Sequence, residues 1–120
     1  MSIQRTFDTS KLVEFSLPSD DKGKVTEVSV TNTQSIAVWG VRPGQKVPTH
    51  IHPDGQDTWI MMKGELTYYL GNGNKRKIAA GQVDVAESSQ VHGALNEGDE
   101  DAVFISIYSA PTLEVEAASP

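Results

Sequence analysis

Three histidines are the residues of this chain whose type and spacing best suit metal binding. His50 and His52 are two positions apart, and His92 follows forty residues after His52 in another predicted strand. Alternate residues of a strand share a face and lie roughly 6 to 7 Å apart, so two imidazoles can converge on one ion while a third arrives from a neighbouring strand. A His-x-His pair by itself is more often two surface or turn residues, so its surroundings decide the interpretation.

The residues around the first two histidines follow a spaced pattern. Gly44 stands six positions before His50, Asp57 five positions after His52, and Gly64 seven positions after Asp57, within GQKVPTHIHPDGQDTWIMMKG. This stretch resembles the first motif of the cupin superfamily, G(X)5HXH(X)3,4E(X)6G. Aspartate occupies the position of the motif's glutamate.

A second stretch, GQVDVAESSQVHGALN, is similar to the second cupin motif, G(X)5PXG(X)2H(X)3N. Gly81, His92 and Asn96 match that motif in identity and spacing, whereas Glu87 and Ser89 replace its proline and glycine. A turn can still form there with these less rigid residues. We therefore expect the turn that leads to His92 to be less rigid than in the motif.

The resemblance implies a metal site made of His50, His52, His92 and one oxygen ligand. Asp57 is the expected oxygen ligand, because it keeps the spacing to the following glycine and is anionic. Gln56 is the alternative, through its amide oxygen. Strand alternation allows only one of these two neighbours to point inward.

Such a ligand set leaves one or two positions open on an octahedral ion, where a substrate can bind. It suits one divalent transition metal ion, Fe, Mn, Ni, Co, Cu or Zn, and the sequence does not choose among them. The resemblance implies a metal-dependent enzyme for a small oxygen-rich molecule, with dioxygenase, isomerase or lyase chemistry. The alternatives are a non-catalytic small-molecule-binding or sensing protein and a metal-free structural barrel.

Three further side chains are expected near the metal. If Asp57 points inward, alternation also turns Trp59 and Met61 inward, either to line an apolar substrate pocket or to pack in the core. Tyr108 shares a strand face with Phe104, and an inward tyrosine can donate a proton or a hydrogen bond to substrate. A purely structural tyrosine is the alternative.

Strand periodicity dominates the elements that must position these residues. Val13, Phe15 and Leu17 alternate with polar residues and predict a strand, and the two-sided apolar run 103–108 predicts a central strand. Short runs separated by turn-forming clusters, with no helical periodicity, indicate a β-sandwich or barrel. We therefore expect an all-β, antiparallel conical barrel or jelly roll of the cupin type.

Composition sets the remaining limits. The 120 residues suit a single domain over 1–120, whose end at 112–120 either pairs as an edge strand or frays. Ten basic and sixteen acidic residues give a net charge of −6, which disfavours nucleic acid and anionic membranes as partners. The absence of cysteine and of a signal-like N-terminus favours a cytoplasmic protein, and edge strands in so small a barrel favour a homodimer.

Overall fold

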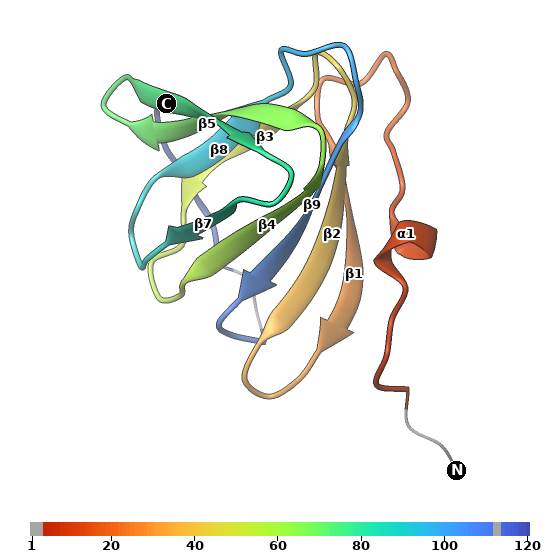
Figure 1. Cartoon of the computed structure of the whole chain (residues 1–120). Helices are drawn as coiled ribbons and strands as arrows, with labels where there is room; N and C mark the ends of the chain where they lie inside the picture. Colours follow the sequence, from red (N-terminus) through yellow and green to blue (C-terminus); the bar gives the residue numbers. More distant parts are fainter. Residues whose placement is uncertain (1–3, 112–113) are drawn as a thin grey trace.

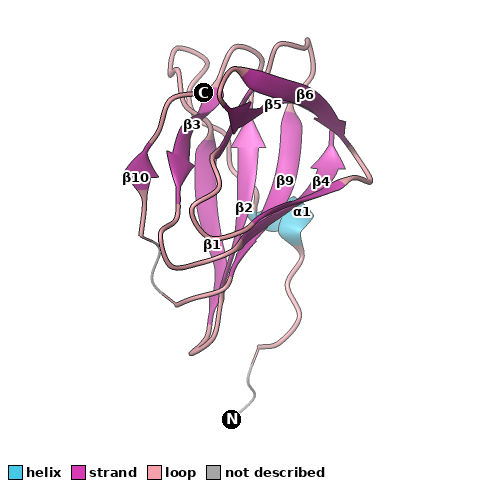
Figure 2. Ribbon diagram, turned by 90° about the vertical axis from the view of Figure 1, so that its left-hand side faces the viewer, coloured by secondary structure: helices cyan, strands magenta, loops and turns pink. Residues whose placement is uncertain are grey.

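The computed structural model describes residues 4–111 and 114–120, which form two five-stranded antiparallel sheets that pack face to face (Figures 1 and 2). The strand order is β1-β2-β9-β4-β7 in one sheet and β10-β3-β8-β5-β6 in the other. The elements are α1 (Thr9–Leu12), β1 (Lys24–Val30), β2 (Ser35–Val41), β3 (Lys46–Ile51), β4 (Asp57–Lys63), β5 (Glu65–Gly71), β6 (Asn74–Ala79), β7 (Val83–Ala86), β8 (His92–Leu95), β9 (Ala102–Tyr108) and β10 (Glu116–Ala117).

This architecture confirms the predicted all-β antiparallel jelly roll. It differs from a closed barrel in that no ladder joins the two sheets among the residues described. Each sheet turns its apolar face toward the other, so the shared interior holds the core and the candidate site. In Figure 1 the two sheets splay apart toward one end of the molecule.

The predicted central strand is β9, which pairs with β2 on one side and with β4 on the other. Its burial alternates strictly, and Phe104 and Tyr108 are among the residues on its buried face. The Phe104 ring stacks on that of Trp59, with centroids 4.0 Å apart, and lies 5.8 Å from that of Trp39. These rings join β2, β9 and β4 into one layer of the core.

Gly64 makes the tight connection between β4 and β5. Its φ is +73°, and a Cβ at this position would lie 2.7 Å from the carbonyl oxygen of Asp101. Glycine therefore relieves both a strained backbone and a close approach. The turn directs β5 into the second sheet, beside β8, which begins at His92.

The strand predicted from Val13, Phe15 and Leu17 is wrong. The chain forms the short helix α1 at Thr9–Leu12, and the following residues cross β2 without joining a ladder. Both edges of β2 are already paired, with β1 and β9, and this segment lies against the face of β2 instead. Phe15 packs where a Cβ on Gly40 would otherwise lie.

The C-terminal segment supplies a short edge strand. Glu116 pairs with Ile51 and Ala117 with His50, which places β10 beside β3 (Figure 2). Of the expected tail, residues 112 and 113 lie outside the described part of the chain. Within the described residues, no helix has the length and apolar character needed to cross a membrane.

Candidate metal centre

The two sheets bring four sequence-distant side chains together in the interior. His50 lies near the end of β3, His52 directly follows that strand, and His92 begins β8, opposite His50 in the ladder. Asp57 begins β4 in the facing sheet. One ligand atom from each of the four residues lies within 4.8 Å of all the others. The four residues of the predicted ligand set therefore share one site.

The surroundings of the three histidines determine which nitrogen of each ring carries the proton. The Nδ1 atoms of His50, His52 and His92 face the carbonyl oxygens of Pro48 at 2.6 Å, Glu114 at 2.6 Å and Gln90 at 3.1 Å. A carbonyl oxygen only accepts, so each Nδ1 carries the proton. In the neutral rings, each Nε2 then holds a lone pair available to a metal ion.

The Nε2 atoms and the Asp57 carboxylate converge. The Nε2 atoms of His50 and His52 are 3.1 Å apart, and Asp57 Oδ2 lies 3.3 Å from Nε2 of His52 and 3.1 Å from Nε2 of His92. Three imidazole nitrogens and one carboxylate oxygen form a donor set that suits a divalent transition metal. The residues present therefore fit such an ion.

Asp57 is the oxygen ligand candidate that points inward. Its side chain is buried, and it accepts hydrogen bonds from Ser106 Oγ at 2.6 Å and from the Trp59 indole nitrogen at 3.2 Å. Gln56 is exposed, and its backbone N–H donates to Ser109 Oγ. Of the two alternatives left open by the sequence, the structure places only Asp57 beside the histidines.

Contacts among the histidines and Asp57 shift their pKa values. Burial and the neighbouring His92 lower the pKa of His50 to about 4. Burial would lower the pKa of His52 too, but hydrogen bonds with Asp57 and the Glu114 carbonyl outweigh it and raise that pKa above its ordinary value. Against the effect of burial, hydrogen bonds with His52, His92 and Ser106 hold the pKa of Asp57 far below its usual range. The carboxylate is therefore charged at neutral pH.

A cavity of about 430 Å³ opens beside this group, between the two sheets. His50, His52 and Asp57 form one side of it, Trp59 adds an aromatic wall, and side chains of β1 and β2 complete it. Met61 does not line the cavity: it is 2% exposed and packs in the hydrophobic core, the alternative that the sequence left open. The cavity gives a ligand access to the imidazole and carboxylate groups of these residues.

Tyr108 lies against the same cavity. Its ring centroid is 4.6 Å from that of His52, and burial together with Asp54 and Glu114 raises the pKa of its hydroxyl. The hydroxyl stays protonated at neutral pH and can donate a hydrogen bond. Gly55 makes room for this ring, because a Cβ on Gly55 would overlap it.

Sequence reasoning missed the contacts that hold the four residues in place. Ser106 carried a detectable signal, since it is a hydroxyl residue on the inward face of β9, between Phe104 and Tyr108. The carbonyl groups of Pro48, Gln90 and Glu114 carry none, because every residue has a carbonyl and only the folded backbone aims it.

A comparison with family models matches residues 37–108 to the cupin domain. This match covers more than half of the chain and includes all four candidate ligands, so the chain belongs to the cupin family. The prediction made from the two spaced motifs is thereby confirmed.

Among curated proteins, the chain is similar to plant oxalate oxidases and to a bacterial isomerase. It is 33% identical over 112 residues to oxalate oxidase 1 of Hordeum vulgare, covering 81% of this chain and 56% of the barley protein. It is 29% identical over 101 residues to the H2HPP isomerase of Bacillus subtilis, covering 84% of this chain and 40% of that protein. The chain thus spans about half the length of the curated relatives it matches.

Solved structures show the same fold over most of the chain. A conserved protein with a double-stranded β-helix domain from Klebsiella pneumoniae is 35% identical, with a TM-score of 0.89 over 98% of this chain and all of that one. An oxalate oxidase structure is 25% identical, with a TM-score of 0.74 over 88% of this chain and 60% of the other.

Proposed function

We propose that the chain is a metal-dependent enzyme whose ion is held by His50, His52, His92 and Asp57. The observation that carries the proposal is the direction of the imidazoles. Each Nδ1 is occupied by a backbone carbonyl, the Nε2 atoms of His52 and His92 turn toward the carboxylate of Asp57, and the Nε2 of His50 turns toward that of His52. Bound there, a divalent ion supplies Lewis-acid chemistry, or oxygen activation when it is redox-active.

The cavity indicates how a substrate is recognised. Among the described residues, those that line it include no lysine or arginine, and its walls include the apolar side chains of Ile36, Trp39 and Trp59. An anionic substrate therefore finds its counter-charge only at the ion. We infer a substrate that combines two oxygen donors, such as a carboxylate with a 2-oxo, hydroxyl or enol group, with an apolar body.

Two side chains of the chain are assigned roles toward this substrate. The protonated hydroxyl of Tyr108 lies in the cavity wall beside His52 and is the candidate donor of a proton or hydrogen bond. Trp59 forms an apolar wall of the cavity while its N–H holds Asp57. The catalytic step then needs only a proton movement at an oxygen or carbon atom next to the chelating group.

The relatives support three reaction classes. The similar proteins include oxalate oxidases and an isomerase, and oxalate decarboxylases share the fold. The apolar volume beside the site exceeds what oxalate itself would fill, which favours isomerisation of a larger 2-oxo acid over oxalate oxidation.

A comparison of two probes tests this proposal. Protein loaded with Mn(II) or Fe(II) is mixed with phenylpyruvate, an enolisable 2-oxo acid with an apolar ring, or with oxalate, which lacks an apolar body. We expect turnover of phenylpyruvate, seen as accelerated keto–enol exchange by ultraviolet absorbance. His92→Ala should abolish it, and Tyr108→Phe should reduce kcat by about 10²-fold with little change in KM.

The outcomes separate the functional classes. Stoichiometric binding of the probe without turnover would support the alternative of a small-molecule-binding or sensing protein. Turnover of oxalate alone would contradict the proposed substrate class. A protein that takes up no metal would support the structural alternative and contradict both others.

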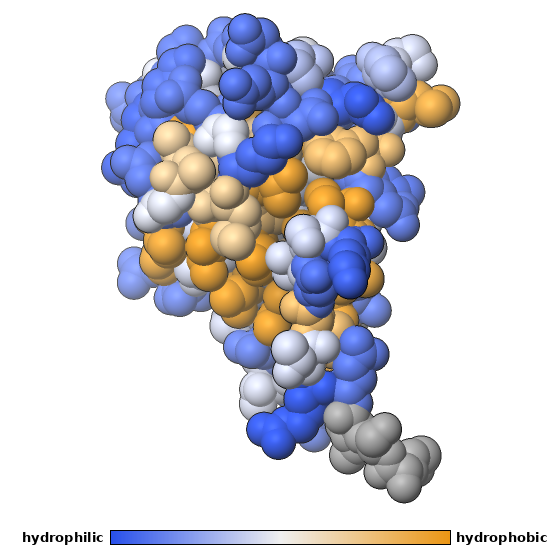
Figure 3. All heavy atoms as spheres, turned by 45° about the vertical axis from the view of Figure 1, so that its right-hand side comes forward, coloured by the Kyte–Doolittle hydropathy of each residue, from blue (hydrophilic) through white to orange (hydrophobic). Residues whose placement is uncertain are grey.

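We also propose that two copies of the chain pair through the outer face of β4 and β7, at the end of their sheet that the segment after α1 does not cover. Apolar side chains gather on this side of the molecule (Figure 3). Met62 on β4 and Val83 and Val85 on β7 are about half exposed there. Packing of these exposed apolar side chains against their copies in a second chain would remove them from water.

The oligomeric state tests this pairing. Sedimentation at micromolar concentration should give a dimer, and Val83→Lys should give a monomer that keeps its circular dichroism spectrum. Glu65→Lys, on the other sheet, serves as the matched control and should remain dimeric. A wild-type monomer at all concentrations would contradict the pairing.

A further inference from the structure

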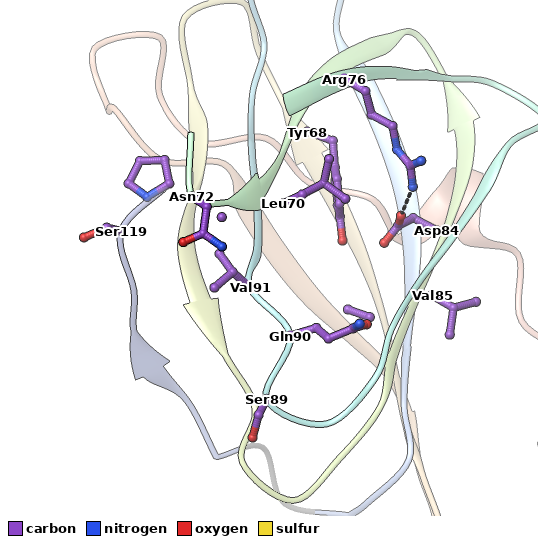
Figure 4. A pocket seen from close by; sticks show the side chains of 13 residues that line it. Tyr68, Leu70, Asn72, Arg76, Asp84, Val85, Ser89, Gln90, Val91 and Ser119 are labelled. Carbon is purple, nitrogen blue, oxygen red and sulfur yellow. Dashed lines mark hydrogen bonds and ion pairs between the residues drawn. The ribbon is translucent and has the colours of Figure 1, made fainter. Parts of the chain in front are cut away.

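A second cavity, of about 600 Å³, lies between the edge strands of the two sheets, away from the candidate metal centre (Figure 4). Its walls come from β5, β6, β7 and the loop before β8, and Ser119 and Pro120 lie at its rim. No described residue lines both this cavity and the one beside the histidines. The proposed function leaves this second cavity without a role.

An ion pair crosses the cavity wall between the sheets. Nη2 of Arg76 on β6 donates to Asp84 Oδ1 on β7 at 2.8 Å, and Figure 4 shows this contact as a dashed line. The Arg76 side chain is 58% exposed, whereas that of Asp84 is only 7% exposed. Arg76 is a donor with five N–H groups, so most of its donor capacity remains for a ligand.

Two more polar groups face the same space. Burial and a hydrogen bond with Asp84 raise the pKa of the Tyr68 hydroxyl far above its usual range, so this group stays protonated. The side-chain oxygen of Gln90 accepts from the backbone N–H of Glu87, which leaves its amide nitrogen as a donor. In Figure 4 the Gln90 amide points toward the part of the cavity where Tyr68 and Asp84 lie.

The charge balance argues for a neutral ligand. Arg76 and Asp84 have the only charged side chains among the described residues that line the cavity, and they neutralise each other. A charged ligand would leave water for a site that offers no free counter-charge, which is costly. A neutral ligand avoids that cost.

The mixture of hydrogen-bond donors and acceptors in the cavity wall favours a ligand that carries hydroxyl groups. Arg76 only donates and Asp84 only accepts, whereas a hydroxyl group does both and can bridge such a pair. Leu70 and Val91 add apolar surface against which carbon–hydrogen groups can pack. The volume lies within the usual range of small-molecule sites.

We propose that this second cavity binds a neutral polyhydroxylated compound, such as a monosaccharide or a cyclic polyol. The Arg76–Asp84 pair recognises adjacent hydroxyl groups, Gln90 donates to a further oxygen atom, and Leu70 packs against the ring. This site is separate from the metal centre and does not depend on the metal being bound.

Titration of ¹⁵N-labelled protein with methyl α-D-glucopyranoside and with myo-inositol tests the proposal. Amide resonances of residues 84–86 and 89–91 should shift on addition of at least one of these probes, while those of residues 50–52 stay in place. D-Glucuronate, an anionic ring of similar size, should bind at least fivefold more weakly. Shifts centred on residues 50–52, no shift with either neutral probe, or tighter binding of glucuronate would overturn the proposal.

Substitutions in the second cavity test whether the neutral probe binds there. Arg76→Gln removes the guanidinium and Leu70→Trp fills the cavity without changing the ion pair, so each should weaken binding of the neutral probe at least tenfold. Lys75→Gln makes the same change of charge on the other face of β6 and should leave the affinity within twofold. Should Arg76→Gln prevent folding, Leu70→Trp still decides the result. Undiminished affinity in Leu70→Trp would contradict the site.

Discussion

The indole N–H of Trp59 donates a hydrogen bond to Oδ2 of Asp57, two residues earlier on the same strand, at 3.2 Å. Asp57 is one methylene shorter than the glutamate expected at this position of the first motif, so its carboxylate needs support to stay near the histidines. Ser106 supplies that support at the other oxygen, Oδ1. The two donors fix both oxygens of the carboxylate.

Removal of the indole donor should weaken metal binding. A hydrogen bond to a charged group contributes about 1.5 to 3 kcal/mol, so Trp59→Phe should reduce the affinity for Mn(II) roughly tenfold while the ring still fills the core. Titration calorimetry measures the change. Trp39→Phe, which also alters a ring beside Phe104 but does not touch Asp57, is the control and should bind as the wild type. Equal losses in both variants would contradict the role of the indole N–H.

Asp57 and Gln56 should differ in their effect on metal affinity. Asp57→Ala removes the buried carboxylate and should cost at least tenfold in affinity, whereas Gln56→Ala changes an exposed side chain and should cost little. Competition with a fluorescent chelator measures both. The opposite ranking would assign the oxygen ligand to Gln56.

Metal affinity should rise with pH across neutrality. A metal ion binds neutral imidazole, and contacts with Asp57 raise the pKa of His52 above its ordinary value of about 6.5, so His52 must lose a proton on binding. His50, with a pKa of about 4, is already neutral and adds nothing in this range. Affinity measured from pH 5 to 9 should therefore fall as the pH drops through and below the His52 pKa.

A control variant identifies the group responsible. In Asp57→Asn the hydrogen bond that raises the pKa of His52 is weakened, so the fall in affinity should move to lower pH. Affinity that stays constant from pH 8 to pH 5 would contradict the assignment of His52 as a ligand.

Gly55→Ala should displace the Tyr108 ring. A Cβ at this position would overlap the ring, and overpacking of this kind costs about 1 to 3 kcal/mol of stability. Denaturant unfolding measures the loss, and near-ultraviolet circular dichroism reports the movement of the ring. Gly98→Ala is the matched control, since its Cβ would meet only Asn96 Oδ1 at 3.4 Å. Equal stability of the two variants would contradict the packing described for Tyr108.

The sequence predicted that His50, His52, His92 and Asp57 would come together, because their spacing maps directly onto strand geometry. His50 and His52 lie near the end of one strand, and His92 lies opposite His50 in the ladder. The inward direction of Asp57 followed from the alternation that also turns Trp59 inward. These relations need only the period of a strand and the identity of the residues.

The sequence misled where tertiary contacts outweigh periodicity. The alternating residues at 13–17 have the pattern of a strand, yet β2 has no free edge to pair with them. The sequence did not predict the second cavity, because Arg76 and Asp84 belong to different sheets and meet only after folding. Met61 faces inward as expected, but whether an inward residue meets a cavity or the core depends on its depth along the strand.

The central claim is that three histidines and one aspartate hold a single divalent ion. The most direct measurement is the metal content of protein reconstituted with Mn(II) and dialysed, compared with that of His92→Ala and of Gln90→Ala, a nearby substitution whose side chain does not reach the ligand group. The wild type and Gln90→Ala should retain close to one ion per chain and His92→Ala almost none. One ion per chain retained in His92→Ala, or none in the wild type, would contradict the site.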